Sequence, residues 1–187
     1  MLSYGPLFDD LGWIRFKLFR VGLGWVESAV PFYNVEMPLS MVAVVVRIDG
    51  NEFPEDLFYH REHMWVRVED GRVRVGYNDW AQSAAGKLLK INTRRAGSVV
   101  QEGKTLGTIE SGKWVGPLKA PVSGKIIEVN EEVLKRPSLI NEDPYGRGWV
   151  AVLEPTDLEN ELKKLIRGSD RATLEAWLRR EKEVHKV

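Results

Sequence analysis

Apolar and polar residues alternate over residues 66–75, on both sides of an Asp70-Gly71 pair. Such a pair between two alternating runs is a strong signal for a β-hairpin, because its turn requires positive φ values that Asp and Gly tolerate. The arginines of this stretch stand at polar positions, so we expect them to face water. Other β-prone runs, bounded by glycine or proline, cover residues 88–91, 104–110, 125–130 and 149–153. The pattern predicts a body made mainly of short strands.

Helical signals follow the hairpin and return near the C-terminus. Asn78 or Asp79 is expected to cap a short helix that runs through Ala85 and stops at Gly86. Residues 156–159 have the sequence of a capping box, in which a Thr hydroxyl and a Glu carboxylate satisfy free amides at a helix start. That helix is expected to end at Gly168, with one apolar face made of Leu158, Leu162, Leu165 and Ile166. A second amphipathic helix is predicted to present Leu174, Trp177 and Leu178 on one side.

Residues 1–50 differ in character from the rest. Residues 12–32 are aromatic and apolar, but Arg15, Lys17, Arg20 and Glu27 interrupt them, which is costly in a membrane span. The segment lacks a clean apolar core and a small-residue cleavage site, which argues against a targeting sequence. We interpret residues 1–50 as a weakly ordered extension and residues 51–187 as one domain. A basic amphipathic surface helix, a partner contact, and an upstream start codon ahead of Met41 are the alternatives that the sequence leaves open.

Composition narrows the class of function. Basic and acidic side chains balance at 27 each, so nothing indicates binding to nucleic acid or to an anionic membrane. The chain has no cysteine, which excludes disulfides and means that any thiol chemistry must come from a bound group. His60 and His63 flank Glu62 without further metal-ligand spacing, and Gly146 and Gly148 lack the context of a nucleotide loop. We therefore predict no catalytic residue and no metal site.

One lysine occupies a distinctive position. The sequence Glu110-Ser111-Gly112-Lys113-Trp114 lies between two strand-like runs, so we expect Lys113 at the tip of a hairpin. Gly112 beside it is expected to allow a tight backbone conformation that a β-branched residue resists. An exposed ammonium group at such a tip is accessible to a modifying enzyme. The alternative is a surface lysine in an ordinary turn.

The residues around Lys113 resemble those of lipoyl-carrier proteins, and most closely those of the H protein of the glycine cleavage system. The lipoyl-carrier motif G-x-x-V-x-x-G is matched by Gly97, Val100 and Gly103. The motif E-S-x-K is matched by Glu110, Ser111 and Lys113, and the motif A-P-V-S-G by residues 120–124. Segments typical of H proteins occur at residues 63–66, 76–82, 129–131 and 139–149. Biotin carriers share the fold but place a methionine on each side of the lysine, whereas here the neighbours are Gly112 and Trp114.

The resemblance implies a fold, a cofactor and partners. The fold would be mainly β with flanking α, a flattened lipoyl/biotinyl-type barrel (barrel-sandwich hybrid) with C-terminal helices. Lipoic acid would be attached to Lys113 as an amide, with Glu110, Ser111, Gly112 and Trp114 presenting the lysine. The partners would be a lipoate ligase or transferase and the enzymes that use the lipoyl arm. We expect a cytoplasmic, monomeric, non-catalytic carrier.

The chain departs from the H-protein pattern at the expected docking surface. Residues 114–117 read Trp-Val-Gly-Pro where H proteins continue with small residues and a Ser-Asp pair, and Lys87, Arg94 and Arg95 add positive charge. This form resembles a divergent group of lipoate-binding proteins that accompany heterodisulfide-reductase-like enzymes of sulfur oxidation. We therefore favour a carrier in sulfur oxidation over an aminomethyl carrier of glycine cleavage, with an unmodified scaffolding protein as a further alternative. Trp114 is expected either to face a partner or to pack back on the sheet.

Overall fold

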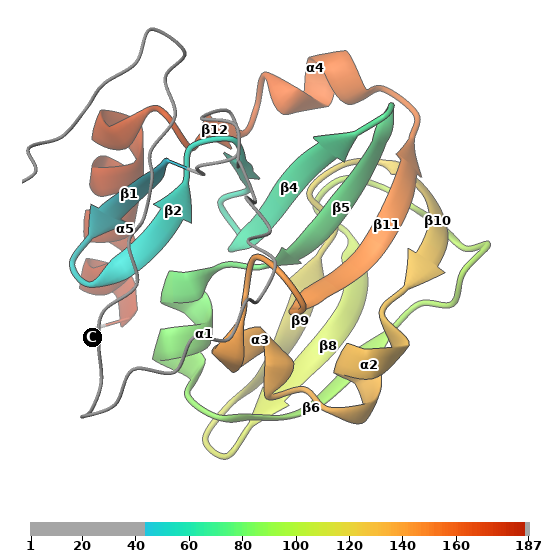
Figure 1. The fold of residues 1–187 in the computed structure, drawn as a ribbon, viewed down its shortest axis with the longest axis horizontal. Helices are drawn as coiled ribbons and strands as arrows, with labels where there is room; N and C mark the ends of the chain where they lie inside the picture. The colour runs from blue at the N-terminus through green and yellow to red at the C-terminus, as the bar shows by residue number, and fades with distance from the viewer. Residues whose placement is uncertain (1–43, 186–187) are drawn as a thin grey trace, which may run out of the picture. The chain divides into compact units, whose positions relative to one another are not determined.

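The computed structural model describes residues 44–185, and the predicted extension over residues 1–43 lies outside the described residues. The chain divides into two units between Ala43 and Val44. The second unit therefore includes residues 44–50, which the sequence pattern assigned to the extension. They contribute β1 and the turn to β2, a small antiparallel hairpin with Ile48 opposite Asn51 (Figure 1).

Short strands make up most of the described unit. They are β1 (Val45–Ile48), β2 (Asn51–Pro54), β3 (Phe58–Tyr59), β4 (Met64–Glu69), β5 (Arg72–Tyr77), β6 (Leu88–Thr93), β7 (Val99–Val100), β8 (Thr105–Ser111), β9 (Val115–Lys119), β10 (Gly124–Val129), β11 (Trp149–Pro155) and β12 (Ile166–Arg167). The helices are α1 (Asp79–Ala85), α2 (Glu131–Lys135), α3 (Leu139–Glu142), α4 (Leu158–Leu162) and α5 (Arg171–His185). The prediction of a mainly β fold with C-terminal helices is confirmed.

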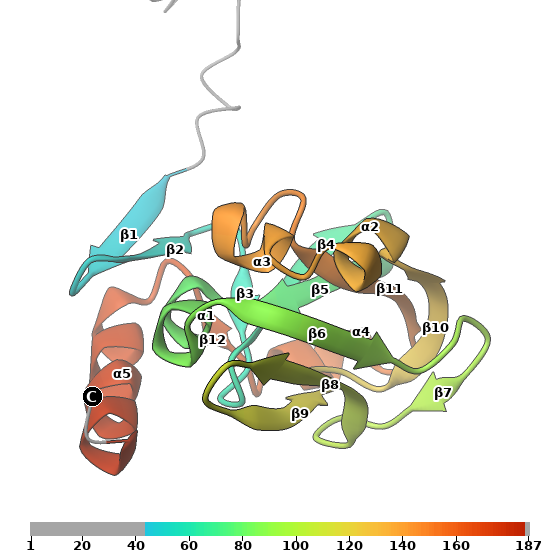
Figure 2. The ribbon, with the colours of Figure 1, turned by 90° about the horizontal axis from the view of Figure 1, so that it is seen from below.

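Two sheets enclose one hydrophobic core. A seven-stranded sheet has the order β12-β3-β4-β5-β11-β10-β7, and a three-stranded sheet has the order β6-β8-β9. Figure 2 shows the three-stranded sheet as a separate layer beneath the strands of the larger one. Fully buried side chains of both sheets, such as Val75, Ile109 and Leu118, belong to a single cluster. This arrangement is a flattened sandwich, as expected for a lipoyl-type domain.

The hairpin predicted around Asp70 and Gly71 is present. Strands β4 and β5 pair from Met64↔Tyr77 to Glu69↔Arg72, and the two turn residues have φ values of 48° and 79°. The expectation that all its arginines face water is wrong for Arg67 and Arg74, which are half-buried. Their guanidinium carbons lie 5.5 Å and 5.1 Å from the ring centroids of Trp65 and Trp149. Long arginine stems cover apolar surface and the charged ends stack on aromatic rings, so a polar position in the pattern need not be an exposed one.

The short helix after this hairpin is confirmed as α1. The Asn78 side chain accepts a hydrogen bond from the Ala81 amide at 2.9 Å, which caps the first turn. Gly86 ends the helix with a φ of 78°, a left-handed value that glycine adopts readily. Strand β6 begins two residues later, and its predicted start at Leu88 is correct.

The capping box predicted for the next helix is wrong. Thr156 donates its hydroxyl and its amide to the carbonyl of Ser123, so it continues the edge of the sheet, and Asp157 takes the N-cap position of α4. Helix α4 ends at Leu162 and not at Gly168, because Ile166 pairs with Tyr59 as part of β12. The four apolar residues expected on one helix face still contact the core, but Leu158 and Leu162 do so from α4, Leu165 from the turn after it and Ile166 from β12.

Helix α5 agrees with its prediction. Leu174, Trp177 and Leu178 are all at most 3% exposed and face the core. Its N-terminus is capped by Asp170, whose carboxylate accepts hydrogen bonds from the Thr173 amide at 3.1 Å and from the Thr173 hydroxyl at 2.6 Å. These contacts hold the pKa of Asp170 below its usual value. No helix within residues 44–185 is long and apolar enough to cross a membrane.

Candidate functional site: the Lys113 hairpin

Strands β8 and β9 form a tight hairpin whose tip carries Lys113. Glu110 pairs with Val115, and the Ser111 amide donates a hydrogen bond to the Trp114 carbonyl at 2.8 Å, which closes the turn. The Lys113 amide donates to the Ser111 hydroxyl at 3.4 Å. Ser111 is 5% exposed, whereas Lys113 is exposed. The hairpin therefore lifts the lysine away from a buried, hydrogen-bonded base, as the spacing of turn residues predicted.

Trp114 lies partly against the hairpin itself. A Cβ atom added to Gly116 would collide with the Trp114 ring, so the ring covers the backbone of β9 at that glycine. The side chain is still 42% exposed. Trp114 therefore packs partly on the sheet, as one of the two expectations had it. The rest of the side chain is exposed to solvent.

Gly112 does not have the backbone role that the sequence suggested. The left-handed φ values among the described glycines occur at Gly50, Gly71, Gly86, Gly97 and Gly103. Gly112 is not one of them, and a Cβ atom built on it meets no heavy atom within 4 Å. Backbone strain therefore gives no reason for a glycine here, and any requirement for Gly112 would come from the enzymes that approach the tip.

The neighbours of the tip are contributed by the chain between α1 and β6. A Cβ atom at Gly86 would lie 3.7 Å from Cε of Lys113, so the lysine stem passes over this glycine. Asn141 of α3 secures the same segment: its amide donates to the Gly86 carbonyl at 3.1 Å and to Gln82 at 2.7 Å. The side-chain oxygen of Asn141 accepts a hydrogen bond from the Leu88 backbone amide at 3.0 Å. The support under Lys113 therefore depends on a residue from a distant part of the chain.

The segment 139–149, which in the sequence served only as a family marker, has a structural role that was missed. Tyr145 donates its hydroxyl to the Glu52 carbonyl at 2.5 Å and accepts from the Asp79 amide at 3.1 Å. Burial raises the pKa of Tyr145 well above its usual value. Asp143 accepts from the amides of Gly146 and Arg147 at 3.0 Å and 2.8 Å. The polar Asn141, directly after the buried pair Leu139 and Ile140, was the available signal for such a brace.

The histidines considered as metal ligands lie in separate surroundings. His60 Nε2 is 3.3 Å from Glu102 Oε1, and this contact is the main cause that holds the pKa of Glu102 below its usual value. His63 lies between the rings of Trp80 and Trp177, at centroid distances of 4.8 Å and 5.3 Å, and its Nε2 is 3.3 Å from Glu181. Among residues 44–185, no group of three potential His, Asp or Glu ligands converges.

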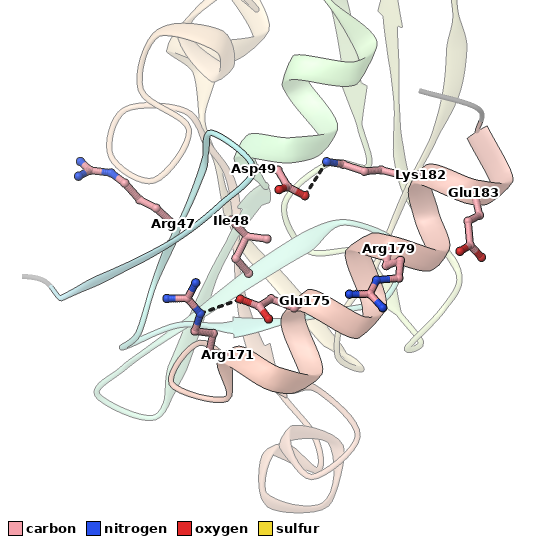
Figure 3. Close-up of a pocket in the computed structure, with 8 residues that line it drawn as sticks. All are labelled: Arg47, Ile48, Asp49, Arg171, Glu175, Arg179, Lys182 and Glu183. Atoms are coloured by element: carbon pink, nitrogen blue, oxygen red, sulfur yellow. Dashed lines mark hydrogen bonds and ion pairs between the residues drawn. The ribbon is translucent and has the colours of Figure 1, made fainter.

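The described cavities lie away from the lysine. One of about 540 Å³ opens between the end of β1 and the exposed face of α5 (Figure 3). Two ion pairs lie in its lining: Lys182 contacts Asp49 at 2.7 Å, and Arg171 contacts Glu175 at 2.7 Å. A second cavity, of about 460 Å³, is bordered by α1 and α3 and includes Asp79 and Asn141. Lys113 lines neither of them.

Comparison with known proteins agrees with this geometry. The family model for the glycine cleavage H-protein matches residues 57–176, a span that contains the Lys113 hairpin and the braces beneath it. The chain belongs to the glycine cleavage H-protein family. Proteins of this family carry lipoate on a lysine and act as carrier subunits. The E-S-x-K segment of this chain ends in Lys113, which is exposed.

Relatives and solved structures of H proteins are similar over most of their own length. The chain is 43% identical over 132 residues to "Glycine cleavage system H protein 2" of Aquifex aeolicus, covering 70% of this chain and 82% of that protein. It is 46% identical over 124 residues to "Glycine cleavage system H protein 3" of the same organism, covering 64% and 77%. The crystal structure of an H protein from Mycobacterium marinum aligns with a TM-score of 0.59 and 35% identity, covering 66% of this chain and 98% of that one.

Proposed function

We propose that Lys113 carries lipoic acid in amide linkage and that this H protein is a mobile carrier, not a catalyst. The observation that carries the proposal is the exposed lysine at the tip of a closed, braced hairpin in a chain of this family. The residues present fit a lipoyl group, because the amine of Lys113 is exposed. The chain also has no cysteine that could form a mixed disulfide with the sulfur atoms of lipoate. When bound, lipoate supplies a disulfide that accepts and releases a substrate group. The chain's own residues hold its attachment point.

We further propose that the cargo is the aminomethyl group of glycine cleavage. In that role the carrier would serve a glycine decarboxylase, a folate-dependent transferase and a dehydrogenase in turn. The support comes from the relatives, which are named glycine cleavage H proteins, and these names give no support to the predicted preference for sulfur oxidation. The cytoplasmic location, the monomeric state and the separate N-terminal extension stay predictions.

A sulfur-substrate carrier is the second candidate. The observation in its favour is the chemistry of the hairpin tip. There the Trp114 ring covers Gly116. Val115 and Pro117 of β9 are exposed. This surface differs from the small and acidic residues that follow the lysine in the H-protein pattern. Interface chemistry governs partner choice, so a different tip favours a different set of enzymes.

The attachment site is tested by mass spectrometry. Protein produced in lipoate-fed cells with a competent ligase is expected to gain one lipoyl group, located on Lys113 by peptide analysis. Lys113→Arg is expected to abolish the addition, because arginine keeps the charge but cannot form the lysine amide. Lys119→Arg, on strand β9, is the matched control and should be modified like the unsubstituted protein. Modification at Lys119 or Lys125, or none at all, would contradict the proposal.

The cargo is tested with purified enzymes. Lipoylated protein is mixed with glycine decarboxylase, glycine and labelled carbon dioxide, and incorporation of label into glycine is measured. Exchange that disappears in Lys113→Arg supports the aminomethyl role. If fully lipoylated protein gives no exchange while a standard H protein does, the sulfur-substrate carrier becomes the better assignment.

A further inference from the structure

The hairpin of β1 and β2 has an edge whose main-chain groups are unpaired. The Glu55 amide donates a hydrogen bond to the Val44 carbonyl at 2.8 Å, so residues 44 and 55 are a hydrogen-bonded pair. Such pairs alternate along an antiparallel ladder, and the main-chain N–H and C=O groups of Val45 and Arg47 therefore point away from β2. Within residues 44–185 these groups form no hydrogen bond. In this part of the chain, the outer edge of β1 is therefore open.

The outer edge of β2, by contrast, is occupied by side chains. The Glu52 amide donates to the Asp79 carboxylate at 2.8 Å, and the Glu52 carbonyl accepts from the Tyr145 hydroxyl at 2.5 Å. The Pro54 carbonyl accepts from the Tyr59 hydroxyl at 3.0 Å, and proline has no N–H group. Of the two strands in this sheet, β1 is therefore the one that can pair with a further strand.

The edges of the other two sheets are protected. Strand β9 contains Pro117, β6 has a bulge between Leu88 and Lys90, and β7 and β12 have two residues each. Proline, bulges and very short strands are ways in which proteins keep sheet edges from pairing with other chains. Strand β1 has none of these features, and the charge of Arg47 is engaged by Glu52 at 2.7 Å. Its open edge is therefore a site where another strand can add.

A row of charged side chains on α5 faces the end of β1. Figure 3 shows Arg171, Glu175 and Arg179 projecting from α5 toward β1, around the cavity of about 540 Å³, and Glu183 lines the same cavity. These residues stand at every fourth position, so they form one stripe of the helix, and their charges alternate in sign. Arg171 is paired with Glu175, whereas Arg179 and Glu183 form no ion pair with a residue of the described range 44–185.

The charge pattern of this row is complementary to itself. When two copies of α5 run antiparallel, with position 177 opposite position 177, Arg171 of one copy lies opposite Glu183 of the other. Glu175 then lies opposite Arg179, because both pairs are centred on the same position. A second copy would thus supply the opposite charges that Arg179 and Glu183 do not find among the described residues of their own chain.

The edge of β1 has a matching symmetry. In an antiparallel pair of β1 strands centred on Val46, Val45 of one copy exchanges main-chain hydrogen bonds with Arg47 of the other, and Arg47 with Val45. A two-fold axis between the two Val46 residues, perpendicular to the sheet, keeps both α5 helices on the same side of the joined sheet. One symmetry operation therefore serves both the open edge and the charged row.

We propose that the open edge of β1 and the charged row of α5, together the β1–α5 face, bind a second copy of this chain in a two-fold dimer. Residues 44–56 and 177–185 lie outside the span that matches the family model, so most of this face is not part of the pattern that defines the family. The proposal does not depend on lipoylation, because Lys113 lies outside the face. The shared strand is short, which predicts a weak dimer that forms at high protein concentration and replaces the expectation of a monomer.

The strand pairing is tested by sedimentation equilibrium of the full-length protein. Measurements from about 10 µM to about 1 mM give the dissociation constant of the dimer. Val45→Pro removes an N–H group that the β1–β2 ladder does not use, and it is expected to raise this constant by at least about tenfold, since each copy loses a hydrogen bond. Val45→Thr is the matched control, because it keeps the N–H group and the β-branched shape, and its constant should stay within about threefold of the original. Equal thermal midpoints of the two variants at low concentration would show that the fold is retained.

Charge reversal tests the helix pairing independently of the strand. Arg179→Glu and Glu175→Arg each place like charges opposite one another in the dimer, so each is expected to raise the dissociation constant by at least about fivefold. An equimolar mixture of the two variants restores opposite charges at both contacts, and its heterodimer should have a constant within about threefold of the original. Arg180→Glu is the matched control, because Arg180 is exposed on α5 but does not line the cavity, and it should also keep the constant within about threefold.

Three results would overturn the proposal. An unsubstituted protein that stays monomeric at the highest concentration has no such interface. A dimer that Val45→Pro and both charge reversals leave unchanged joins through another surface. A mixture of Arg179→Glu and Glu175→Arg that associates no better than either variant alone would show that the two charged rows do not face each other. None of these results bears on Lys113, because lipoylation is measured separately by mass.

Discussion

At the scale of single residues, two glycines of strand β8 and its turn occupy very different surroundings. Gly107 packs so closely against the backbone of β6 that a Cβ atom there would collide with the Asn92 carbonyl oxygen. A Cβ atom built on Gly112 meets no heavy atom within 4 Å beyond its chain neighbours, and the residue lacks a left-handed φ. The first glycine is therefore needed by the fold, whereas the second can matter only for recognition.

This difference gives a testable pair of substitutions. Gly107→Val is expected to lower the free energy of unfolding by at least about 2 kcal/mol, because strand β6 must move to relieve the collision. Gly112→Val should leave that free energy within about 0.5 kcal/mol of its original value. Urea denaturation followed by circular dichroism measures both. Equal destabilisation by the two variants would show that the turn at Gly112 is strained after all.

Lipoylation of the folded Gly112→Val variant separates fold from recognition. We still expect slower modification, because a branched side chain beside Lys113 lies in the path of the modifying enzyme. Modification at the original rate would show that this glycine is dispensable for presentation of the lysine.

At the scale of elements, the two C-terminal helices begin in different ways. The Asp170 carboxylate accepts two hydrogen bonds at the start of α5, whereas Asp157 at the start of α4 makes no side-chain cap bond. Helix α5 also buries Leu174, Trp177 and Leu178, so its docking on the core depends on a well-formed first turn. Helix α4 has five residues, and its Glu161 carboxylate accepts hydrogen bonds from the amide and the hydroxyl of Ser123, directly before β10.

Asp170→Ala is therefore expected to lower the thermal midpoint, with Asp157→Ala as a control that changes it less. The effect of Asp170 should depend on pH. Its pKa is lowered in the folded protein, so its stabilisation is fully present above the unfolded pKa of about 3.9 and is lost as pH falls through the lower folded value. Melting curves at pH 7 and near pH 2 measure this. A midpoint difference between wild type and Asp170→Ala that persists at the lower pH would contradict the assignment.

At the scale of the whole molecule, hydrogen bonds from α3 join distant parts of the chain beneath the lysine. Asn141 contacts Gln82, Gly86 and Leu88, residues 53 to 59 positions earlier. Asn130 acts in a similar way, since its side chain donates to the carbonyls of Arg147 and Trp149. These clamps hold α1, β6 and β11 in fixed positions around the core.

Asn141→Ala is expected to destabilise the fold by about 1–3 kcal/mol, because it leaves partly buried partners without their hydrogen bonds. Asn160→Ala provides the matched control, since Asn160 is exposed and its side chain forms hydrogen bonds with Asp157 and Lys163, the two residues that flank α4. Chemical denaturation of both variants measures the difference. A loss no greater than that of Asn160→Ala would show that the clamp contributes little.

The sequence by itself determined the features that depend on neighbouring residues. The Asp70-Gly71 hairpin, the start and end of α1 at Asn78 and Gly86, the apolar face of α5 and the exposed tip at Lys113 follow from turn chemistry and periodicity, which act over a few residues. The family motifs around Lys113 likewise lie in one continuous stretch, so the lysine's role could be predicted without the fold.

Only the tertiary structure decided the features that depend on distant partners. Residues 156–166 have a helical pattern, but the hydrogen bond from Thr156 to Ser123 moved the N-cap to Asp157, and pairing of Ile166 with Tyr59 followed a helix that ended at Leu162, because sheet hydrogen bonds outweighed a local preference. Arg67 and Arg74 became half-buried because aromatic rings from the sheet lay within their reach. The ring of Trp114 on Gly116 and the clamp at Asn141 exist only once the strands and helices are packed, since each joins residues whose proximity no local pattern encodes.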